Sequence, residues 1–181
     1  GMPVGPLAVI DEINLGLVSQ IRKQTRKDLA TEGKELPLIP ADQVIDLMTE
    51  KINRLGRAQG GGFYEYPENG KKYLWPELQT HFPIAKDPLT QDQMIERILF
   101  IQAIETIRAY EENVVTSVAE ANIGSIFGWG FSPEKGGTLQ FINDYGIKKF
   151  EKRSQELYKK YGKRFIPPKM LIKMASNKET F

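Results

Sequence analysis

The feature that most constrains the fold is a long apolar stripe near the middle of the sequence. Thr90 and Gln93 have the spacing of a capping box, which marks the start of a helix. Apolar side chains then recur with helical spacing, at Met94, Ile95, Ile98, Leu99, Ile101, Ile104 and Ile107. A stripe this wide is normally buried on more than one side, so the sequence predicts a central helix of about twenty residues.

The rest of the sequence also favours helices. Apolar residues within 17–21 have the spacing of a helix face. A second helix begins near Pro40 and ends near Gly56. Residues 60–88 are typical of a loop with a short extended piece at 62–66. Beyond the central helix, Ser117 and Glu120 start another helix, a charged helix ends at Gly162, and a last one follows residues 167–168. No strand–helix alternation is present, so the sequence predicts an all-α fold.

Composition excludes several classes of function. A net charge of +2, with basic residues scattered apart from a solvated helix at 148–163, argues against nucleic-acid binding. The absence of cysteine excludes disulfides and thiolate chemistry and is consistent with a cytoplasmic protein. No apolar run reaches the roughly 20 residues needed to cross a bilayer.

The sequence contains an internal repeat. Placing Gly5 against Gly137 aligns Leu7 with Leu139, Ile10 with Ile142 and Asp11 with Asn143, and a later shift pairs Val44, Ile45 and Met48 with Met170, Leu171 and Met174. Each copy alone is too small to bury its apolar faces, so we expect the two to pack together. The predicted organisation is a first helical unit at 1–66, truncated at its start, a linker loop at 67–89 and a second helical unit at 90–181.

Four ordered segments carry a resemblance to a known family. They are MPVGPLAVIDEINL (2–15), GRAQGGGFYEY (56–66), EANIGSIFGWGFSPEKGG (120–137) and RFIPP (164–168). Together they resemble the C-terminal domain of L-3-hydroxyacyl-CoA dehydrogenases, which implies a 6-phosphogluconate dehydrogenase C-terminal-like fold with two pseudo-repeated helical units packed together around a long central helix. Tandem units of this kind are typical of the multifunctional fatty-acid oxidation complex alpha subunit, whereas the single-function enzymes carry one unit and dimerise through it. The resemblance therefore implies dimer-like packing between the two units of this chain. Ser132 and Asn122 depart from the family pattern, where a proline and an acidic residue are usual.

The resemblance implies a parent enzyme of fatty-acid β-oxidation that oxidises L-3-hydroxyacyl-CoA to 3-ketoacyl-CoA with NAD, and that is in some members fused to an enoyl-CoA hydratase. The sequence itself has no GxGxxG; the nearest string, residues 128–133, has Pro133 at the third glycine position and no preceding strand. His81 is the only histidine and reads as a surface or linker residue. We therefore expect no catalytic residue, no cofactor and no metal site in this chain, and no turnover by it alone.

The resemblance places one segment near the substrate. Met2, Pro3, Val4, Gly5 and Pro6 would line the acyl or pantetheine path in a cleft shared with the missing N-terminal half. An apolar, rigid turn with an exposed methionine suits that role, although the same residues serve equally well to start a helix.

Two further motifs have structural interpretations. Residues 60–62 form a glycine run that is followed by aromatic residues rather than by a helix, which favours a tight turn over a phosphate cradle. Phe63, Tyr64 and Tyr66 are then expected to cover the core, and Trp129 to anchor two helices.

Two alternatives remain open at this point. In the first, the chain is a non-enzymatic helical interaction module that binds a partner subunit such as a thiolase. In the second, it is an unrelated member of the wider helical class found in hydroxy-acid dehydrogenases.

Overall fold

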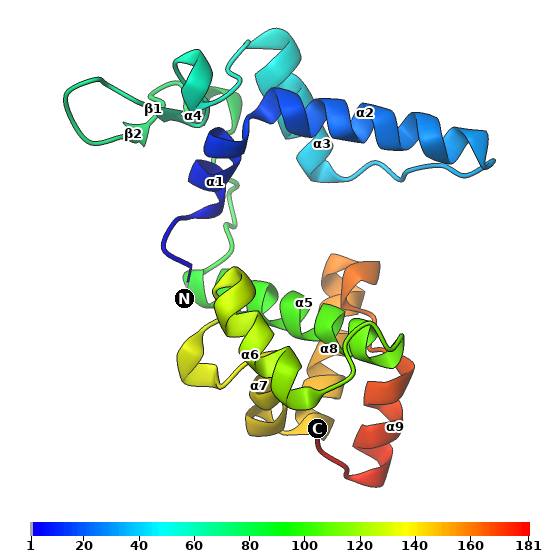
Figure 1. Ribbon diagram of the computed structural model, residues 1–181. Coiled ribbons are helices and arrows are strands. Elements are labelled where there is room, and N and C mark those ends of the chain that lie inside the picture. Colours follow the sequence, from blue (N-terminus) through cyan, green and yellow to red (C-terminus); the bar gives the residue numbers. More distant parts are fainter. Residues whose placement is uncertain (1) are drawn as a thin grey trace. The chain divides into compact units, whose positions relative to one another are not determined.

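The computed structural model describes residues 2–181, and helices dominate it (Figure 1). The all-α prediction is confirmed. Within the described residues the only strands are the short pair β1 (Tyr64–Glu65) and β2 (Tyr73–Leu74), which are antiparallel with Tyr64 opposite Leu74. None of the helices in this part of the chain combines the length and the apolar character that crossing a membrane requires.

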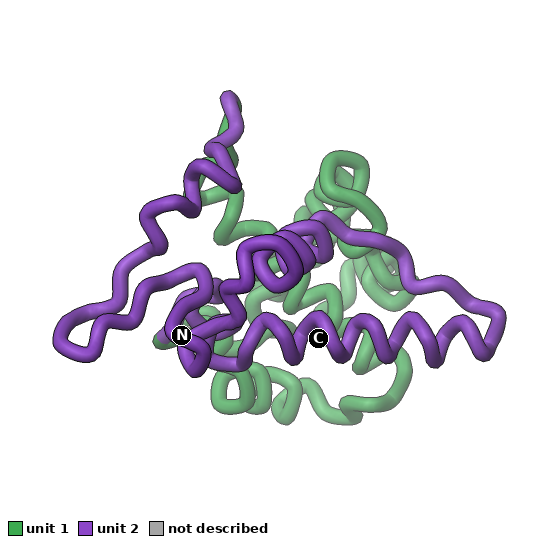
Figure 2. Tube along the Cα trace, turned by 90° about the horizontal axis from the view of Figure 1, so that it is seen from above, with its two compact units in different colours: residues 1–3, 87–181 green, residues 4–86 purple. Residues whose placement is uncertain are grey.

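The chain divides into two compact units, coloured separately in Figure 2. Residues 4–86 form the N-terminal unit, and residues 87–181, with which residues 2 and 3 are grouped, form the C-terminal unit. Residues 67–86, expected to be linker, contain β2 and the short helix α4 (Leu78–His81), and Trp75 among them is buried in the N-terminal core. Gly1, at the start of the predicted first unit, lies outside the described residues. That the two units pack on each other stays a prediction.

The N-terminal unit is built from α1 (Pro6–Ile13), α2 (Leu15–Thr31) and α3 (Pro40–Asp46), which continues as the π-helical turn η1 (Leu47–Lys51). Asn14 separates α1 from α2 with a φ of 89°, and its side-chain Oδ1 accepts the N–H of Gly16 at 2.7 Å, which caps α2. The 3-10 turn η2 (Arg57–Gln59) precedes the β1–β2 hairpin. The core consists of Leu15, Ile45, Met48, Phe63 and Trp75.

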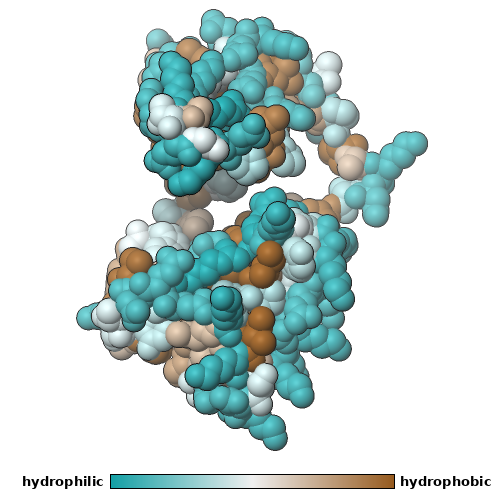
Figure 3. Space-filling model, turned by 90° about the vertical axis from the view of Figure 1, so that its right-hand side faces the viewer, coloured by the Kyte–Doolittle hydropathy of each residue, from teal (hydrophilic) through white to brown (hydrophobic). Residues whose placement is uncertain are grey.

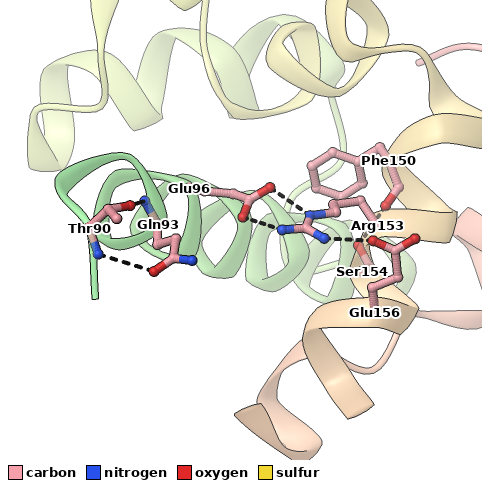
Figure 4. Close-up of polar contacts among 7 residues, drawn as sticks. All are labelled: Thr90, Gln93, Glu96, Phe150, Arg153, Ser154 and Glu156. Carbon is pink, nitrogen blue, oxygen red and sulfur yellow. Dashed lines mark hydrogen bonds and ion pairs between the residues drawn. The ribbon is translucent and has the colours of Figure 1, made fainter. Parts of the chain in front are cut away.

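The C-terminal unit begins with the predicted long helix, α5 (Gln91–Glu111). The predicted capping box is present: the Gln93 N–H donates to Thr90 Oγ1 at 3.3 Å and the Thr90 N–H to Gln93 Oε1 at 3.1 Å (Figure 4). The other elements are α6 (Val118–Trp129), η3 (Pro133–Lys135), α7 (Thr138–Tyr145), α8 (Ile147–Tyr161), η4 (Lys163–Phe165) and α9 (Lys169–Asn177).

One face of α5 carries the C-terminal core. Phe100, Ala103, Ile104 and Ile107 have no exposed surface, and the Phe100 ring stacks on Phe150 of α8 with 4.2 Å between centroids. The start of the apolar stripe is different, because it faces solvent: Met94, Ile95 and Ile98 are 46%, 46% and 49% exposed. Burial on more than one side, expected for the whole stripe, therefore does not extend to its first two turns.

A charged bridge joins α5 to α8 (Figure 4). Arg153 donates from Nε and Nη2 to the two carboxylate oxygens of Glu96, at 2.7 and 2.8 Å, and from Nη1 to Glu156 at 2.6 Å. The hydrogen bonds to Glu96, followed by the one to Glu156, raise the pKa of Arg153 above its usual range. This bidentate geometry fixes the register of α8 against α5.

Candidate functional site

The segment predicted to line the substrate path is exposed and directly precedes α1. Met2 is 53% and Val4 37% exposed, Gly5 is the N-cap of α1, and Pro6 is its first residue. Pro6 therefore does start a helix, as the alternative interpretation expects. Met2 and Pro3 are grouped with the C-terminal unit, and Val4, Gly5 and Pro6 with the N-terminal unit. Contact of these residues with substrate stays a prediction.

The best-organised polar site of the N-terminal unit is centred on Asp11 of α1. Asp11 is only 1% exposed. Oδ1 accepts the Phe63 N–H at 2.8 Å, and Oδ2 accepts the Tyr64 N–H at 2.9 Å and the Tyr66 hydroxyl at 3.0 Å. A buried carboxylate needs such donors to offset its lost hydration. Asp11 thus fastens the aromatic segment 63–66 to α1.

Glycine is required where this segment crosses α1. A Cβ at Gly62 would lie 2.1 Å from Asp11 Oδ1, and one at Gly56 would lie 2.5 Å from the Asp11 carbonyl oxygen. Gly56 also has a φ of +131°, which side chains rarely adopt. The segment can therefore approach Asp11 only because these positions have no side chain.

The N–H groups of the glycine run are all used inside the turn. Gly60, Gly61 and Gly62 donate to the carbonyls of Arg57, Gly56 and Tyr64, at 3.1, 3.0 and 3.1 Å. A phosphate cradle needs free N–H groups that point at the ligand. The prediction of a tight structural turn is confirmed.

Arg54 holds the same segment from its other side. Its Nε donates to the Gly62 carbonyl at 2.7 Å and Nη2 to the Tyr64 carbonyl at 3.1 Å, and Nη1 lies 3.0 Å from a Glu65 carboxylate oxygen. The guanidinium also lies over the Trp75 ring, 4.6 Å from its centroid. A Cβ at Gly61 would lie 2.5 Å from Nη2, so a side chain at this position would displace the guanidinium.

The Tyr66 hydroxyl donates its hydrogen bond to the Asp11 carboxylate. Burial, then the hydrogen bond to Asp11, raise the pKa of the Tyr66 hydroxyl above its usual range. The phenol therefore stays protonated at neutral pH and donates to the carboxylate. Phe63 is 3% exposed and belongs to the core, as expected, whereas Tyr64 and Tyr66 are partly buried.

His81 and the Gly128–Pro133 string take structural positions. The His81 ring, on α4, stacks on the buried Trp75 ring at 5.2 Å between centroids. Gly130, with a φ of 74°, ends α6, and the Phe131 N–H donates to the Ser125 carbonyl at 2.9 Å. The string thus contains the C-terminal end of a helix, whereas a dinucleotide loop precedes the N-terminus of one.

The C-terminal unit contains an open pocket of about 480 Å³ between α5, α9 and the end of the chain. Glu111, at its wall, accepts the Met170 N–H at 2.8 Å and so stabilises the start of α9. Lys169 and Lys173 line the pocket together with Glu111 and Glu179, so its charged side chains balance. Across residues 2–181, no group of three or more His, Asp or Glu side chains is placed to hold a metal ion.

Sequence reasoning did not identify Asp11 and Arg54 as the organising residues. A signal for Asp11 was present, since an acidic residue among Val9, Ile10 and Ile13 on a short helix needs buried partners. The identity of those partners was not readable, because they lie 52 to 55 positions further along the chain.

Comparison with protein families matches residues 1–66 to 3-hydroxyacyl-CoA dehydrogenase, C-terminal domain. The matched range includes Asp11, its three donors, the required glycines and Arg54. The resemblance predicted from the sequence is confirmed for this range.

Proposed function

Because residues 1–66 match the 3-hydroxyacyl-CoA dehydrogenase C-terminal domain, we propose that the chain is the C-terminal helical part of a fatty-acid β-oxidation enzyme. The parent enzyme, in this proposal, is cytoplasmic and oxidises L-3-hydroxyacyl-CoA to 3-ketoacyl-CoA with NAD. The single observation that carries the proposal is the family match over the segment that Asp11 organises.

The proposal assigns NAD binding and proton abstraction to a half of the enzyme outside residues 1–181. Hydride transfer needs a general base at the 3-hydroxyl and a dinucleotide site on a strand–turn–helix unit. In the described residues, the only histidine is stacked on Trp75 and the Gly128–Pro133 string ends a helix. These positions support a bracing role for the chain.

In this proposal, residues 2–6 form one wall of the cleft that binds the acyl or pantetheine part of the substrate. Met2 and Val4 are apolar and exposed, and Pro3 and Pro6 limit the backbone on either side of them. An acyl chain or a pantetheine arm gains binding energy from such a surface at little cost in ordering.

Two assays test this assignment. The full-length enzyme should reduce NAD with an L-3-hydroxyacyl-CoA substrate, and replacing Val4 by Asp should raise KM with little change in kcat. Isothermal titration of residues 1–181 with NADH should give no heat of binding. Tight stoichiometric binding of NADH by this chain would refute the assignment of the cofactor site to the other half.

The packing role has its own test. If the second unit replaces the partner subunit of a dimeric relative, residues 1–181 should be monomeric or weakly dimeric by light scattering. A tight dimer that buries α1 and α2 would show that the second unit does not take the place of a partner subunit.

One observation favours the second candidate function, an interaction module for a partner such as a thiolase subunit. Ile123, Phe127 and Trp129 on α6 are 57%, 84% and 46% exposed, and Gly124 and Gly128 beside them have no neighbouring heavy atom within 4 Å of a Cβ position. Co-purification with purified thiolase, lost on replacing Phe127 by Asp, would support this role. Retention of binding by that variant would exclude α6 as the contact.

A further inference from the structure

The loop between β1 and β2 carries the only Asn–Gly pair of the sequence, Asn69–Gly70. Residues 67–72 are all exposed, and the loop projects from the rest of its unit (Figure 1). Glu68, Lys71 and Lys72 make it hydrophilic, as is most of the face drawn in Figure 3. Solvent therefore reaches both members of the pair.

An Asn–Gly pair has a chemistry of its own, which needs no enzyme. The main-chain nitrogen of the second residue, once it has lost its proton, attacks Cγ of the asparagine and closes a succinimide ring. A side chain on the second residue hinders this approach, and glycine has none. The reaction also needs a free N–H group, because a hydrogen-bonded amide must first leave its acceptor.

The other six asparagines of the chain do not meet this second condition. The N–H groups that follow Asn122 and Asn143 lie inside the helices α6 and α7. The N–H groups that follow the remaining asparagines each donate to a main-chain carbonyl, and they belong to Leu15, Arg54, Val114 and Lys178. At these six positions the fold itself opposes ring closure.

The Gly70 N–H group is free. The β1–β2 ladder ends with the pair Glu65 and Tyr73, so it does not reach this residue. Among residues 2–181 the Gly70 N–H has no hydrogen-bond acceptor, and the Asn69 side chain makes no hydrogen bond either. A Cβ at Gly70 would meet only the Pro67 ring, at 3.5 Å, so this part of the loop is not packed against the core.

The charges of the loop favour the same attack. Lys71 and Lys72 follow the pair directly and Glu68 precedes it, so positive charge is in excess. A nearby positive charge favours the deprotonated form of a group that loses a proton. The Gly70 nitrogen must lose its proton before it attacks Asn69, so the neighbouring lysines make this step easier.

We propose that Asn69 converts without an enzyme to aspartate and isoaspartate, which makes the β1–β2 loop a site of slow covalent self-modification. The deprotonated Gly70 nitrogen forms a bond to Asn69 Cγ, and the Cγ–Nδ2 bond breaks. The Gly70 proton passes to solvent, and solvent returns one proton to the departing nitrogen, which leaves as ammonia. Water then opens the succinimide at one of its two carbonyls and gives aspartate or isoaspartate. No oxidant or reductant takes part.

Both products change the loop. Each adds a negative charge beside Lys71 and Lys72, so the excess of positive charge disappears. Isoaspartate also routes the main chain through the former side-chain carbonyl and lengthens the loop by one methylene group. The modification therefore acts on the segment that closes β2 against β1, and it needs none of the chemistry of the proposed dehydrogenase.

Peptide mapping of residues 1–181 tests the proposal. The protein is incubated at neutral and at alkaline pH and digested with trypsin at mildly acidic pH, beside a zero-time sample. Peptide 58–71 contains Asn69 and no other asparagine. It should gain the mass of an amide-to-acid change and become a substrate of protein isoaspartyl methyltransferase, at a rate that rises with hydroxide concentration. Asn113 is the internal control: it is exposed, but the next N–H is hydrogen-bonded, so it should convert at least about tenfold more slowly.

Two comparisons show whether the folded loop itself reacts. The free peptide 58–71 should convert at a rate comparable with that of the folded protein. Much slower conversion in the protein would mean that the fold protects the pair, and would overturn the proposal. Equal conversion at Asn69 and Asn113, or a rate that does not depend on pH, would overturn it too. Asn69→Gln should remove the mass change from peptide 58–71 and leave the melting temperature unchanged, whereas a mass change that persists in this variant would assign the reaction to another residue.

Discussion

At the scale of single residues, the molecule depends on one buried carboxylate. Asp11 receives three hydrogen bonds from a segment more than fifty positions away, and the glycines at 56 and 62 leave just enough room for it. Its role is to hold the segment 56–66 against α1. The same side chain therefore decides whether this segment keeps its shape.

Replacing Asp11 by Ala should destabilise the N-terminal unit by about 3 kcal/mol, because buried donors lose their acceptor. Asp11→Asn should cost less, since the amide oxygen can still accept the Phe63 N–H. The measurement is urea unfolding followed by Trp75 fluorescence in a Trp129→Phe background. Glu12→Ala, one position along α1 in an exposed ion pair with Arg57, is the control and should stay within about 0.5 kcal/mol of wild type. Wild-type stability for Asp11→Ala would contradict this account.

Tyr66 should make stability fall at alkaline pH. The unfolded phenol titrates near its ordinary pKa of 10.0, while the folded phenol keeps its proton to higher pH. The folded state therefore binds more protons above pH 10.0, so its stabilising contribution is complete below that pH and is lost as pH rises further. Tyr66→Phe should make the alkaline decline in urea midpoint shallower, and the exposed Tyr158→Phe should leave the decline unchanged. Identical declines for wild type and Tyr66→Phe would rule out this titration as the cause.

At the scale of elements, local signals were sufficient where the interaction is local. The Thr90–Gln93 box and the apolar spacing after it predicted α5, since capping and periodicity act within a few residues. The extended piece at 62–66 was predicted and contains β1. Its pairing with β2 and the burial of Trp75 were not predicted, because they rest on Arg54 and on a hydrogen bond from the Trp75 N–H to the Phe63 carbonyl. For the same reason the glycine turn was predicted, and Asp11, which accepts hydrogen bonds from the aromatic segment after that turn, was not.

The two faces of α5 should respond differently to the same substitution. Ile104 is completely buried, so Ile104→Asp should destabilise the C-terminal unit by about 4 kcal/mol, the cost of burying an unpaired charge. Ile98 is 49% exposed, and Ile98→Asp should change stability by no more than about 0.5 kcal/mol. Thermal unfolding followed by circular dichroism measures both. Equal losses would mean that the start of the stripe is buried in solution.

At the scale of the whole molecule, the two units have separate cores. The core of the N-terminal unit includes Trp75, and that of the C-terminal unit is centred on Phe100 and Phe150. Trp75 lies in the range 67–89 that the sequence assigned to a linker, so this one side chain also tests where the first unit ends. A side chain in a linker contributes little to stability, whereas a buried tryptophan contributes several kcal/mol.

Trp75→Ala should therefore lower the free energy of opening of amides in α2 and α3 by about 3 kcal/mol, measured by native-state hydrogen exchange. Amides of α8 should change by less than about 0.5 kcal/mol, because distant sites without shared partners act independently. Phe150→Ala should give the reverse pattern, with the loss in α8 and α5. If Trp75→Ala changes neither unit, residues 67–86 are a linker after all. If both substitutions lower protection equally in both units, the chain unfolds as one cooperative body, and the separate cores do not describe how it is stabilised.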